Sequence, residues 1–188
     1  MDKIIFIDRD GVINQDPMAA NTGKEYITDW PEFHFLPGAL EALKRLTKNG
    51  YKIVIVSNQA GVGKGIYTKD KLDEITKNMF REIEATGGKI HSVQYCIHTK
   101  EDNCDCRKPN TGLFKKAIES LKIDFTKAFF IGDTKRDIEA GEKLGCKTIL
   151  VLCGKVKDEK EIVGWGSKPD FIKKDLSEAV EEVVCKKR

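Results

Sequence analysis

Short runs of apolar, β-branched residues recur along the chain, and polar residues follow most of them. Runs of four or five such residues predict buried strands, because they are too short and too β-branched for helices. The predicted strands cover residues 4–7, 52–56, 93–96, 128–131 and 148–152. Residues 169–172 and an amphipathic stretch at 176–184 complete the chain.

Between these runs, apolar residues recur at the spacing of an amphipathic helix. The predicted apolar faces are Leu40, Leu43 and Leu46; Leu72, Ile75, Met79 and Ile83; Phe114, Ala117, Ile118 and Leu121; and Ile138, Ala140 and Leu144. Thr68 is the expected N-cap of the second helix. Strands that alternate with helices predict the α/β class, with a parallel sheet covered by helices on both faces. Ligands of such sheets bind at the carboxyl ends of the strands.

Three polar segments interrupt this pattern. Residues 14–36 hold several turn-forming residues and predict a long loop that overhangs the first strand, so that Asp16 is a candidate substrate contact. The glycine-rich stretch 61–65 fits neither the P-loop nor the dinucleotide fingerprint, and we interpret it as a flexible substrate loop. Residues 155–168 give no readable pattern.

Composition and charge narrow the class of protein. The 188 residues, of which 40% are hydrophobic, fit a single globular domain over 1–188. The net charge of +3 is too small to indicate nucleic-acid binding by itself. No run approaches the roughly 18 apolar residues of a membrane span, and Asp8 interrupts the N-terminal run too early for a signal peptide. We therefore expect a cytoplasmic monomer that acts on a small molecule and binds neither nucleic acid nor membrane.

The first predicted strand ends in Asp8-Arg9-Asp10-Gly11. Side chains alternate along a strand, so Asp8 and Asp10 emerge on the same side. Two carboxylates so close together repel each other, and a divalent cation holds both in the ionised form. The pattern indicates a Mg²⁺ centre; the alternative is a pair of turn or helix-capping aspartates.

Further polar residues are predicted at the same edge of the sheet. Ser57 follows the second strand, and Asp133 follows the fourth and is the expected third Mg²⁺ ligand beside Asp8 and Asp10. Asp137 has two interpretations, because it either fixes a loop or metal-bound water or is an acid favoured at a helix N-terminus.

Such a centre suits phosphate chemistry. Asp8 would attack phosphorus, and Asp10 would protonate the leaving oxygen and then activate water. Ser57 would hold phosphoryl oxygens and Lys108 would neutralise their charge.

A second constellation comprises three cysteines and a histidine, Cys96, His98, Cys104 and Cys106. Three thiolates and an imidazole form a complete tetrahedral set for Zn²⁺, which leaves no open position and predicts a structural metal. The zinc would staple the loop 96–106, which delivers Arg107 and Lys108. The alternatives are a redox pair or chance clustering.

The motifs Asp8-x-Asp10-Gly11, Ser57, Lys108 and Gly132-Asp133-x-x-x-Asp137 resemble those of the haloacid dehalogenase (HAD) superfamily of phosphohydrolases, clearly over about residues 3–154. The zinc loop that ends in Cys104-Asp105-Cys106-Arg107-Lys108-Pro109 resembles the subgroup of D-glycero-D-manno-heptose 1,7-bisphosphate 7-phosphatases and histidinol-phosphatase domains. The resemblance implies a Rossmann-like sheet without a large cap domain, a catalytic Mg²⁺ and a structural Zn²⁺.

The resemblance also implies residue roles. It makes Asp8 the nucleophile, Asp10 the acid/base, Asp133 a metal ligand and Lys108 the charge stabiliser. The substrate contacts that it implies are Ser57, Asn58, Gln59, Ala60 and Arg107, and Arg107 is expected to read the distal part of the substrate.

The expected substrate is a small sugar phosphate, heptose 1,7-bisphosphate, which loses its 7-phosphate. Residues 57–67 resemble the matching segment of the heptose enzymes. Two features depart from that pattern: Thr134 stands where those enzymes commonly have lysine, and the gap of five residues between His98 and Cys104 is short, as in the histidinol enzyme. The alternatives are a histidinol-phosphate phosphatase, a polynucleotide 3′-phosphatase and a catalytically silent zinc-stapled binding protein.

Overall fold

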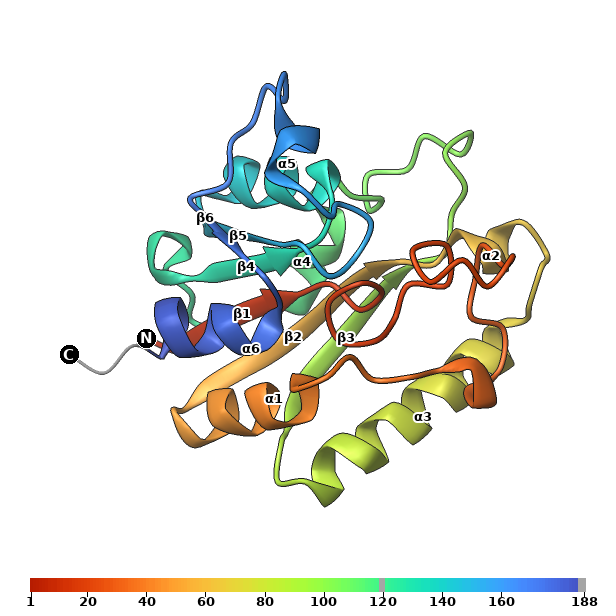
Figure 1. The fold of residues 1–188 in the computed structure, drawn as a ribbon, viewed down its shortest axis with the longest axis horizontal. Helices are drawn as coiled ribbons and strands as arrows, with labels where there is room; N and C mark the ends of the chain where they lie inside the picture. The colour runs from red at the N-terminus through yellow and green to blue at the C-terminus, as the bar shows by residue number, and fades with distance from the viewer. Residues whose placement is uncertain (119–120, 186–188) are drawn as a thin grey trace.

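A single parallel sheet forms the centre of the molecule (Figure 1). The computed structural model describes residues 1–118 and 121–185. Six strands in the order β3-β2-β1-β4-β5-β6 make up the sheet. They are β1 (Lys3–Ile7), β2 (Tyr51–Asn58), β3 (Ile90–Cys96), β4 (Phe129–Gly132), β5 (Lys147–Val151) and β6 (Phe171–Lys173). The predicted α/β class is confirmed, and the described residues contain no separate cap domain.

Helices cover both faces of the sheet. The α-helices are α1 (Ala39–Lys48), α2 (Ala60–Gly63), α3 (Lys69–Ala85), α4 (Gly112–Ala117), α5 (Lys135–Leu144) and α6 (Leu176–Ala179). Single turns are η1 (Trp30–Glu32), η2 (Phe125–Lys127) and η3 (Glu159–Ile162), and a π-helical turn, η4 (Val180–Val184), continues α6. No helix of the described ranges is long and apolar enough to cross a membrane.

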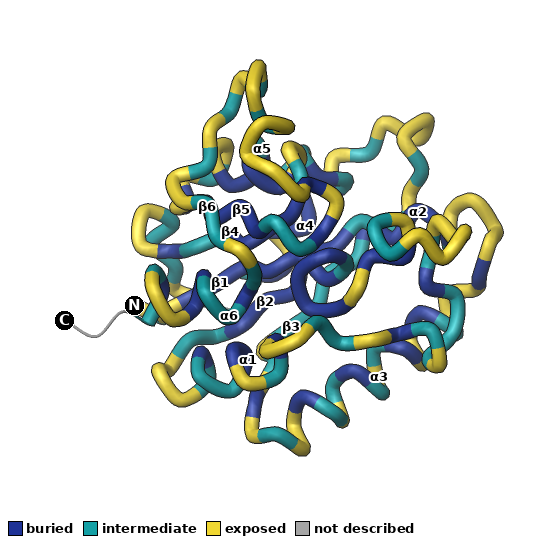
Figure 2. The backbone as a smooth tube through the Cα atoms, viewed as in Figure 1, coloured by how far each residue is buried: buried dark blue, intermediate teal, exposed yellow. Residues whose placement is uncertain are grey.

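The alternation of side chains in β1 explains the two layers. Ile5 and Ile7 belong to the core beneath α1, α3 and α6, whereas Ile4 and Phe6 belong to the core beneath α4 and α5. Successive residues of a strand point to opposite faces, so one strand supplies both cores. Figure 2 shows the central strands as the most continuously buried part of the chain.

The register places the strand ends that carry the polar residues at one level. Ile7 of β1 pairs with Ile55 of β2 on one side and with Ile131 of β4 on the other. The residues that follow, Asp8 and Gly132-Asp133, therefore lie at the same edge as Ser57. The chain runs from β1 outward to β3 and then crosses to β4 on the other side of β1. This reversal is the switch point at which ligands of α/β sheets bind.

Two segments differ from the sequence-based expectation. Residues 60–63 form the helical turn α2 rather than a flexible loop, because Gly61 packs so closely against the Tyr67 ring that a Cβ would collide with it. The predicted helix over Phe114 to Leu121 already ends at Ala117, since Ile118 closes a tighter turn onto the carbonyl of Lys115. Residues 119 and 120 of that prediction lie outside the described ranges.

The long segment 14–36 is a loop, as predicted, but it is packed down by its own aromatic residues. Phe33 is buried and lies 5.1 Å from the rings of both Trp30 and Phe35. Two ion pairs attach the loop to the site edge: Lys64 lies 3.2 Å from Glu25, and Lys155 lies 3.5 Å from Asp16.

Candidate active site

Three carboxylates meet at the carboxyl edge of the sheet. Asp8, Asp133 and Asp137 are buried, and each offers an oxygen within 4.8 Å of the others. Lys108 places its Nζ 3.0 Å from Asp8 Oδ2 and 2.6 Å from Asp137 Oδ1. One lysine leaves excess negative charge among three buried acids, so the cluster favours a further cation.

Glycines allow the close packing around Asp133. A Cβ at Gly11 or at Gly154 would collide with Asp133 Oδ2, so both positions require glycine. The same oxygen accepts the backbone N–H of Lys155 at 2.7 Å. One oxygen of Asp133 is thereby fixed by the protein, which leaves the other for a ligand.

Asp137 is the acid at a helix N-terminus that one of the two interpretations describes, and it also pairs with Lys108. Its Oδ2 accepts the backbone N–H of Thr134 at 3.0 Å and the Thr134 hydroxyl at 2.6 Å, which completes a capping box at the start of α5. Its Oδ1 pairs with Lys108. The cap therefore fixes the carboxylate that orients the lysine.

The pKa values agree with a cation site. Burial, with a further contribution from Asp137 and Asp8, raises the pKa of Asp133 well above its ordinary value. Burial also raises the pKa of Asp8, in spite of the nearby Lys108 ammonium. Oxygen ligands of this kind are those that Mg²⁺ takes, so the cluster fits a magnesium ion on its donor chemistry.

The carboxylate of Asp10 lies outside this three-acid group and is held by donors. It accepts hydrogen bonds from Arg9 Nε at 3.1 Å, Asn14 Nδ2 at 2.9 Å and Gln59 Nε2 at 2.7 Å. Although burial opposes them, the Arg9 charge and these hydrogen bonds hold the pKa of Asp10 below its usual value. The resting protein thus favours an ionised Asp10.

Gln59 is a member of the Asp10 network. Its side chain is only 2% exposed and accepts the Tyr67 hydroxyl at 2.6 Å and Arg9 Nη2 at 3.1 Å. It does not line the cavities around the acids. The structure therefore places this expected substrate contact behind Asp10.

Asn58 connects the site to the zinc loop. Its amide accepts the Lys108 backbone N–H at 3.0 Å and donates to the Lys108 carbonyl at 3.2 Å. The end of β2 thereby fixes the backbone of the residue that carries the ammonium. Asn58 and Ser57 also line the cavity that contains Asp8.

The remaining expected contacts lie around the entrance. Ala60 and Arg107 line cavities beside the acids. Asp16 is buried and accepts the backbone N–H of Ala19 at 3.0 Å, in addition to its ion pair with Lys155. Asp16 is therefore connected to the cavities through Lys155 and does not line them itself.

The acids line a small cavity with two larger neighbours. The catalytic cavity, about 50 Å³ in volume, includes Asp8, Asp10, Ser57, Lys108 and Asp133 in its wall. Two side cavities of about 240 and 230 Å³ adjoin it, and Arg107 lines both. Since drug-sized ligands occupy pockets of roughly 300 Å³ or more, the catalytic cavity by itself is too small for a whole ligand of that size.

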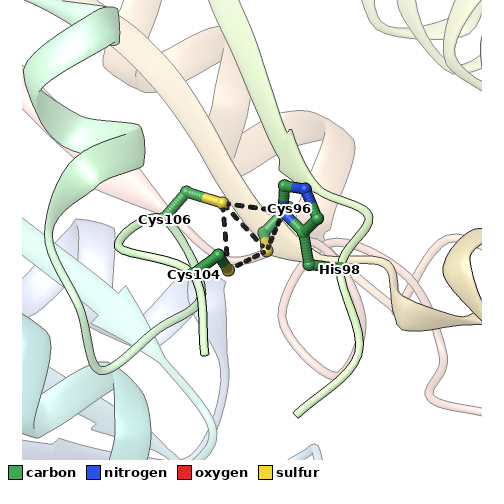
Figure 3. A group of neighbouring side chains, drawn as sticks. All are labelled: Cys96, His98, Cys104 and Cys106. Atoms are coloured by element: carbon green, nitrogen blue, oxygen red, sulfur yellow. Dashed lines mark hydrogen bonds between the residues drawn. The ribbon is translucent and has the colours of Figure 1, made fainter. Parts of the chain in front are cut away.

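The cysteine–histidine group assembles as the sequence predicts (Figure 3). The three Sγ atoms of Cys96, Cys104 and Cys106 lie 3.2 to 3.6 Å apart, and His98 Nδ1 lies 3.2 Å from Cys106 Sγ. Tetrahedral Zn–S bonds of about 2.3 Å place sulfur atoms about 3.8 Å apart, close to this spacing. None of the three thiols forms a disulfide. The donor set and its spacing therefore fit a metal ion in Cys₃His coordination.

Sequence reasoning missed three residues of the site. Arg9 is 1% exposed and lies between the rings of Phe33 and Tyr95, at 5.9 and 5.6 Å. Its place between the two motif aspartates was the available signal. Lys155 lies in the segment 155–168, which gave no recognisable sequence pattern. The only sequence signal for Arg136 was its place among charged residues at the start of a predicted helix.

Comparison with known proteins agrees with this geometry. The fold, the acid–lysine cluster and its order along the chain define a HAD-like hydrolase, and a family profile described as HAD-hydrolase-like matches residues 105–179. D-glycero-beta-D-manno-heptose-1,7-bisphosphate 7-phosphatase from Neisseria meningitidis is 36% identical over 155 residues, which cover 82% of this chain and 80% of that protein. The enzyme of that name from Bordetella bronchiseptica is 30% identical and covers 97% of this chain and 98% of its own.

A crystal structure of D,D-heptose 1,7-bisphosphate phosphatase from B. bronchiseptica, complexed with magnesium and phosphate, superimposes with a TM-score of 0.88 at 30% identity and covers 97% of this chain and 98% of that chain. The corresponding structure from Burkholderia thailandensis gives a TM-score of 0.71 at 30% identity, with 98% and 99% coverage. The chain belongs to the D-glycero-D-manno-heptose-1,7-bisphosphate 7-phosphatase family of HAD-like hydrolases.

Proposed function

We propose that the protein is a Mg²⁺-dependent phosphatase that removes the 7-phosphate of D-glycero-D-manno-heptose 1,7-bisphosphate. The observation that carries the proposal is the catalytic cavity. Its wall includes Asp8, Lys108, Asp133 and Asp137, which surround a space for one phosphoryl group. The identity of about a third to proteins of that name supports the substrate.

Asp8 is the proposed nucleophile. Its Oδ1 accepts the Arg9 N–H at 2.7 Å and its Oδ2 faces Lys108, so its orientation is fixed before substrate binds. Attack of the carboxylate on phosphorus forms an aspartyl phosphate and breaks the bond to the sugar oxygen. Lys108 and the Ser57 hydroxyl balance the charge on the phosphoryl oxygens.

Asp10 is the proposed acid and base. It gives a proton to the departing sugar oxygen, then takes a proton from the water that attacks the aspartyl phosphate, which releases inorganic phosphate and restores Asp8. Arg9 and Gln59 hold Asp10 ionised at rest, so Asp10 must take up one proton from solvent when the substrate binds. The negative charge of a phosphate dianion in the cavity favours this uptake.

Magnesium would be held by Asp8 and Asp133, with Asp10 as the further ligand expected from the motif. When bound, it supplies charge neutralisation for the phosphoryl group. The buried, mutually repelling carboxylates of Asp8 and Asp133 support this assignment.

Zinc is the proposed occupant of the Cys₃His site. Four protein ligands complete a tetrahedron, so the metal has a structural role and stabilises the loop that carries Arg107 and Lys108. Thiolate ligands and six unpaired cysteines are typical of a reducing compartment, and we propose the cytoplasm as the location and a monomeric single domain as the active form.

A phosphate-release panel tests the function. It compares both anomers of heptose 1,7-bisphosphate with histidinol phosphate and with a 3′-phosphorylated oligonucleotide, at equal Mg²⁺. We expect the highest kcat/KM on a heptose bisphosphate. A higher value on histidinol phosphate would reassign the substrate, and no turnover of any of them would refute the phosphatase assignment.

The covalent step has its own test. An Asp10→Asn variant lacks the acid for the first step and the base for the second. On an aryl phosphate, whose leaving group needs no acid, only the second step fails, so the aspartyl phosphate should accumulate. Mass spectrometry should then detect one added phosphoryl group on Asp8 after brief exposure to substrate. The Asp8→Asn, Asp10→Asn double variant is the control and should stay unmodified.

A further inference from the structure

Arg136 lies where all the cavities of the site meet. It stands in the first turn of α5 and is exposed. It lines the catalytic cavity and both side cavities, and no other residue in the described ranges lines all three. An arginine in this position can therefore reach a group that extends from the reacting phosphoryl group into either side cavity.

Of the other cations that line the side cavities, Lys100 is exposed and lies outside the catalytic cavity, and the rest are already engaged. Lys64 pairs with Glu25 at 3.2 Å, and Lys155 pairs with Asp16 at 3.5 Å. Arg107 donates from Nη1 to the His98 carbonyl at 3.2 Å. Among the residues that the structure describes, Arg136 has neither a hydrogen-bond partner nor a carboxylate within 4.0 Å.

Helix stability does not explain the position of Arg136. A cation in the first turn faces the positive end of the helix dipole, which disfavours it. An anionic ligand reverses this effect, because both the dipole and the guanidinium then attract it. The planar guanidinium also matches two phosphate oxygens at once.

We propose that Arg136 is a specificity-determining residue that binds the second phosphate of the substrate, the one that is not transferred. The inference rests on the proposed function. The catalytic cavity of about 50 Å³ has room for the reacting group alone, so the second phosphate lies in a side cavity that Arg136 lines. Thr134 adds no charge at the start of α5, and Arg136 supplies one from two residues further on.

Steady-state kinetics on two substrates test this role. The wild-type protein and Arg136→Gln are compared on heptose 1,7-bisphosphate and on heptose 7-phosphate, which lacks the second phosphate. We expect KM for the bisphosphate to rise about 10- to 100-fold with kcat little changed, because a charged hydrogen-bond partner is lost. On heptose 7-phosphate, the kinetic constants of the variant and the wild type should agree.

Two further variants separate the contact from general electrostatics. Arg136→Lys keeps the charge but loses the planar fork, so it should restore part of the affinity for the bisphosphate. Lys135→Gln removes an equal charge from the neighbouring position, where the side chain pairs with Glu139 at 3.6 Å and lines none of the three cavities. It should leave both substrates unaffected.

Calorimetry gives a readout other than turnover. Heptose 1-phosphate, which carries only the second phosphate, should bind Arg136→Gln about 10- to 100-fold more weakly than it binds the wild type. Equal losses on both substrates would overturn the proposal and place Arg136 at the reacting phosphoryl group. Unchanged constants on both would overturn it as well. Failure of the wild type to hydrolyse either sugar phosphate would instead refute the proposed function.

Discussion

The two proposed metal sites hold their side chains together in different ways. The acid cluster draws Asp8, Lys108, Asp133 and Asp137 from distant parts of the chain to one sheet edge. The cysteine–histidine cluster lies within the 11 residues from Cys96 to Cys106. The first therefore depends on the whole sheet and the second mainly on one strand end and one loop.

The two clusters also differ in what remains for a ligand. The acids line a cavity and carry more negative charge than their lysine neutralises, so the site stays poised for a cation and a phosphate. Three sulfur atoms and one nitrogen already surround a single point, so a metal bound by all four would have no position for substrate. Uncompensated charge that lines a cavity suits catalysis, whereas a complete set of four ligands suits stability.

The strongest way to break this comparison is to remove the nucleophile. Asp8→Asn should lower kcat about 10⁴-fold or more, because no other group in the cluster can form the covalent intermediate. Phosphate release measures the loss. The melting temperature should stay close to that of the wild type, since repulsion among the buried acids decreases. Near-normal activity would refute the assignment of Asp8.

Loss of a thiolate should act on stability first. Cys104→Ser should abolish stoichiometric zinc and lower the free energy of unfolding by about 2 kcal/mol or more, roughly 4 to 8 °C in Tm. Metal analysis and thermal denaturation test this. Cys185→Ser is the matched control, because Cys185 lies outside the cluster, and it should retain zinc. Retention of zinc by Cys104→Ser would contradict the ligand set.

Asn58 connects the two regions, and its removal should have an intermediate effect. Asn58→Ala deletes two hydrogen bonds to the Lys108 backbone. We expect kcat to decrease about 10-fold, at about 1 kcal/mol or less for each bond. Zinc content should stay unchanged, because the thiolates are untouched. A loss of zinc would show that the two regions are less separate than their geometry indicates.

The smallest expected effect is the pH dependence of stability without metal. The pKa values of Asp8 and Asp133 are raised in the folded protein, so folding favours their protonated forms. The free energy of unfolding therefore decreases as the pH rises above the ordinary carboxyl range. In a chelator, lowering the pH from 7 toward 5 should therefore raise Tm relative to the profile of Asp133→Asn. Magnesium should raise Tm more at pH 7 than at pH 5. Equal magnesium shifts at both values would contradict a site built from these acids.

Much of the fold followed from local pattern. The first strand was predicted correctly because a buried parallel strand is a short apolar run. Leu72, Ile75, Met79 and Ile83 were correctly assigned to the core, and Thr68 caps their helix. The prediction of a flexible loop over residues 61–65 was wrong, because Ala60–Gly63 form a helical turn. That turn packs Gly61 against Tyr67, a contact that the local pattern does not reveal.

In the candidate site too, some groups of residues follow from local spacing and others only from the fold. Cys96, His98, Cys104 and Cys106 could be grouped from spacing alone, because their side chains are held by one short segment. The place of Gln59 beside Asp10, outside the walls of the three cavities, depends on a hydrogen bond to Tyr67 and on the burial of Arg9. Such contacts join side chains whose separation in space no local pattern encodes.

The sequence by itself determined the class of the sheet, the two aspartates at the end of its first strand and the four ligands of the thiolate cluster. Each of these depends on neighbours along the chain. Only the tertiary structure decided that Asp137 both caps α5 and orients Lys108, and that Arg136 lines all three cavities. Those facts depend on how β1, β4 and the zinc loop converge at one edge, which the packing of the whole domain fixes.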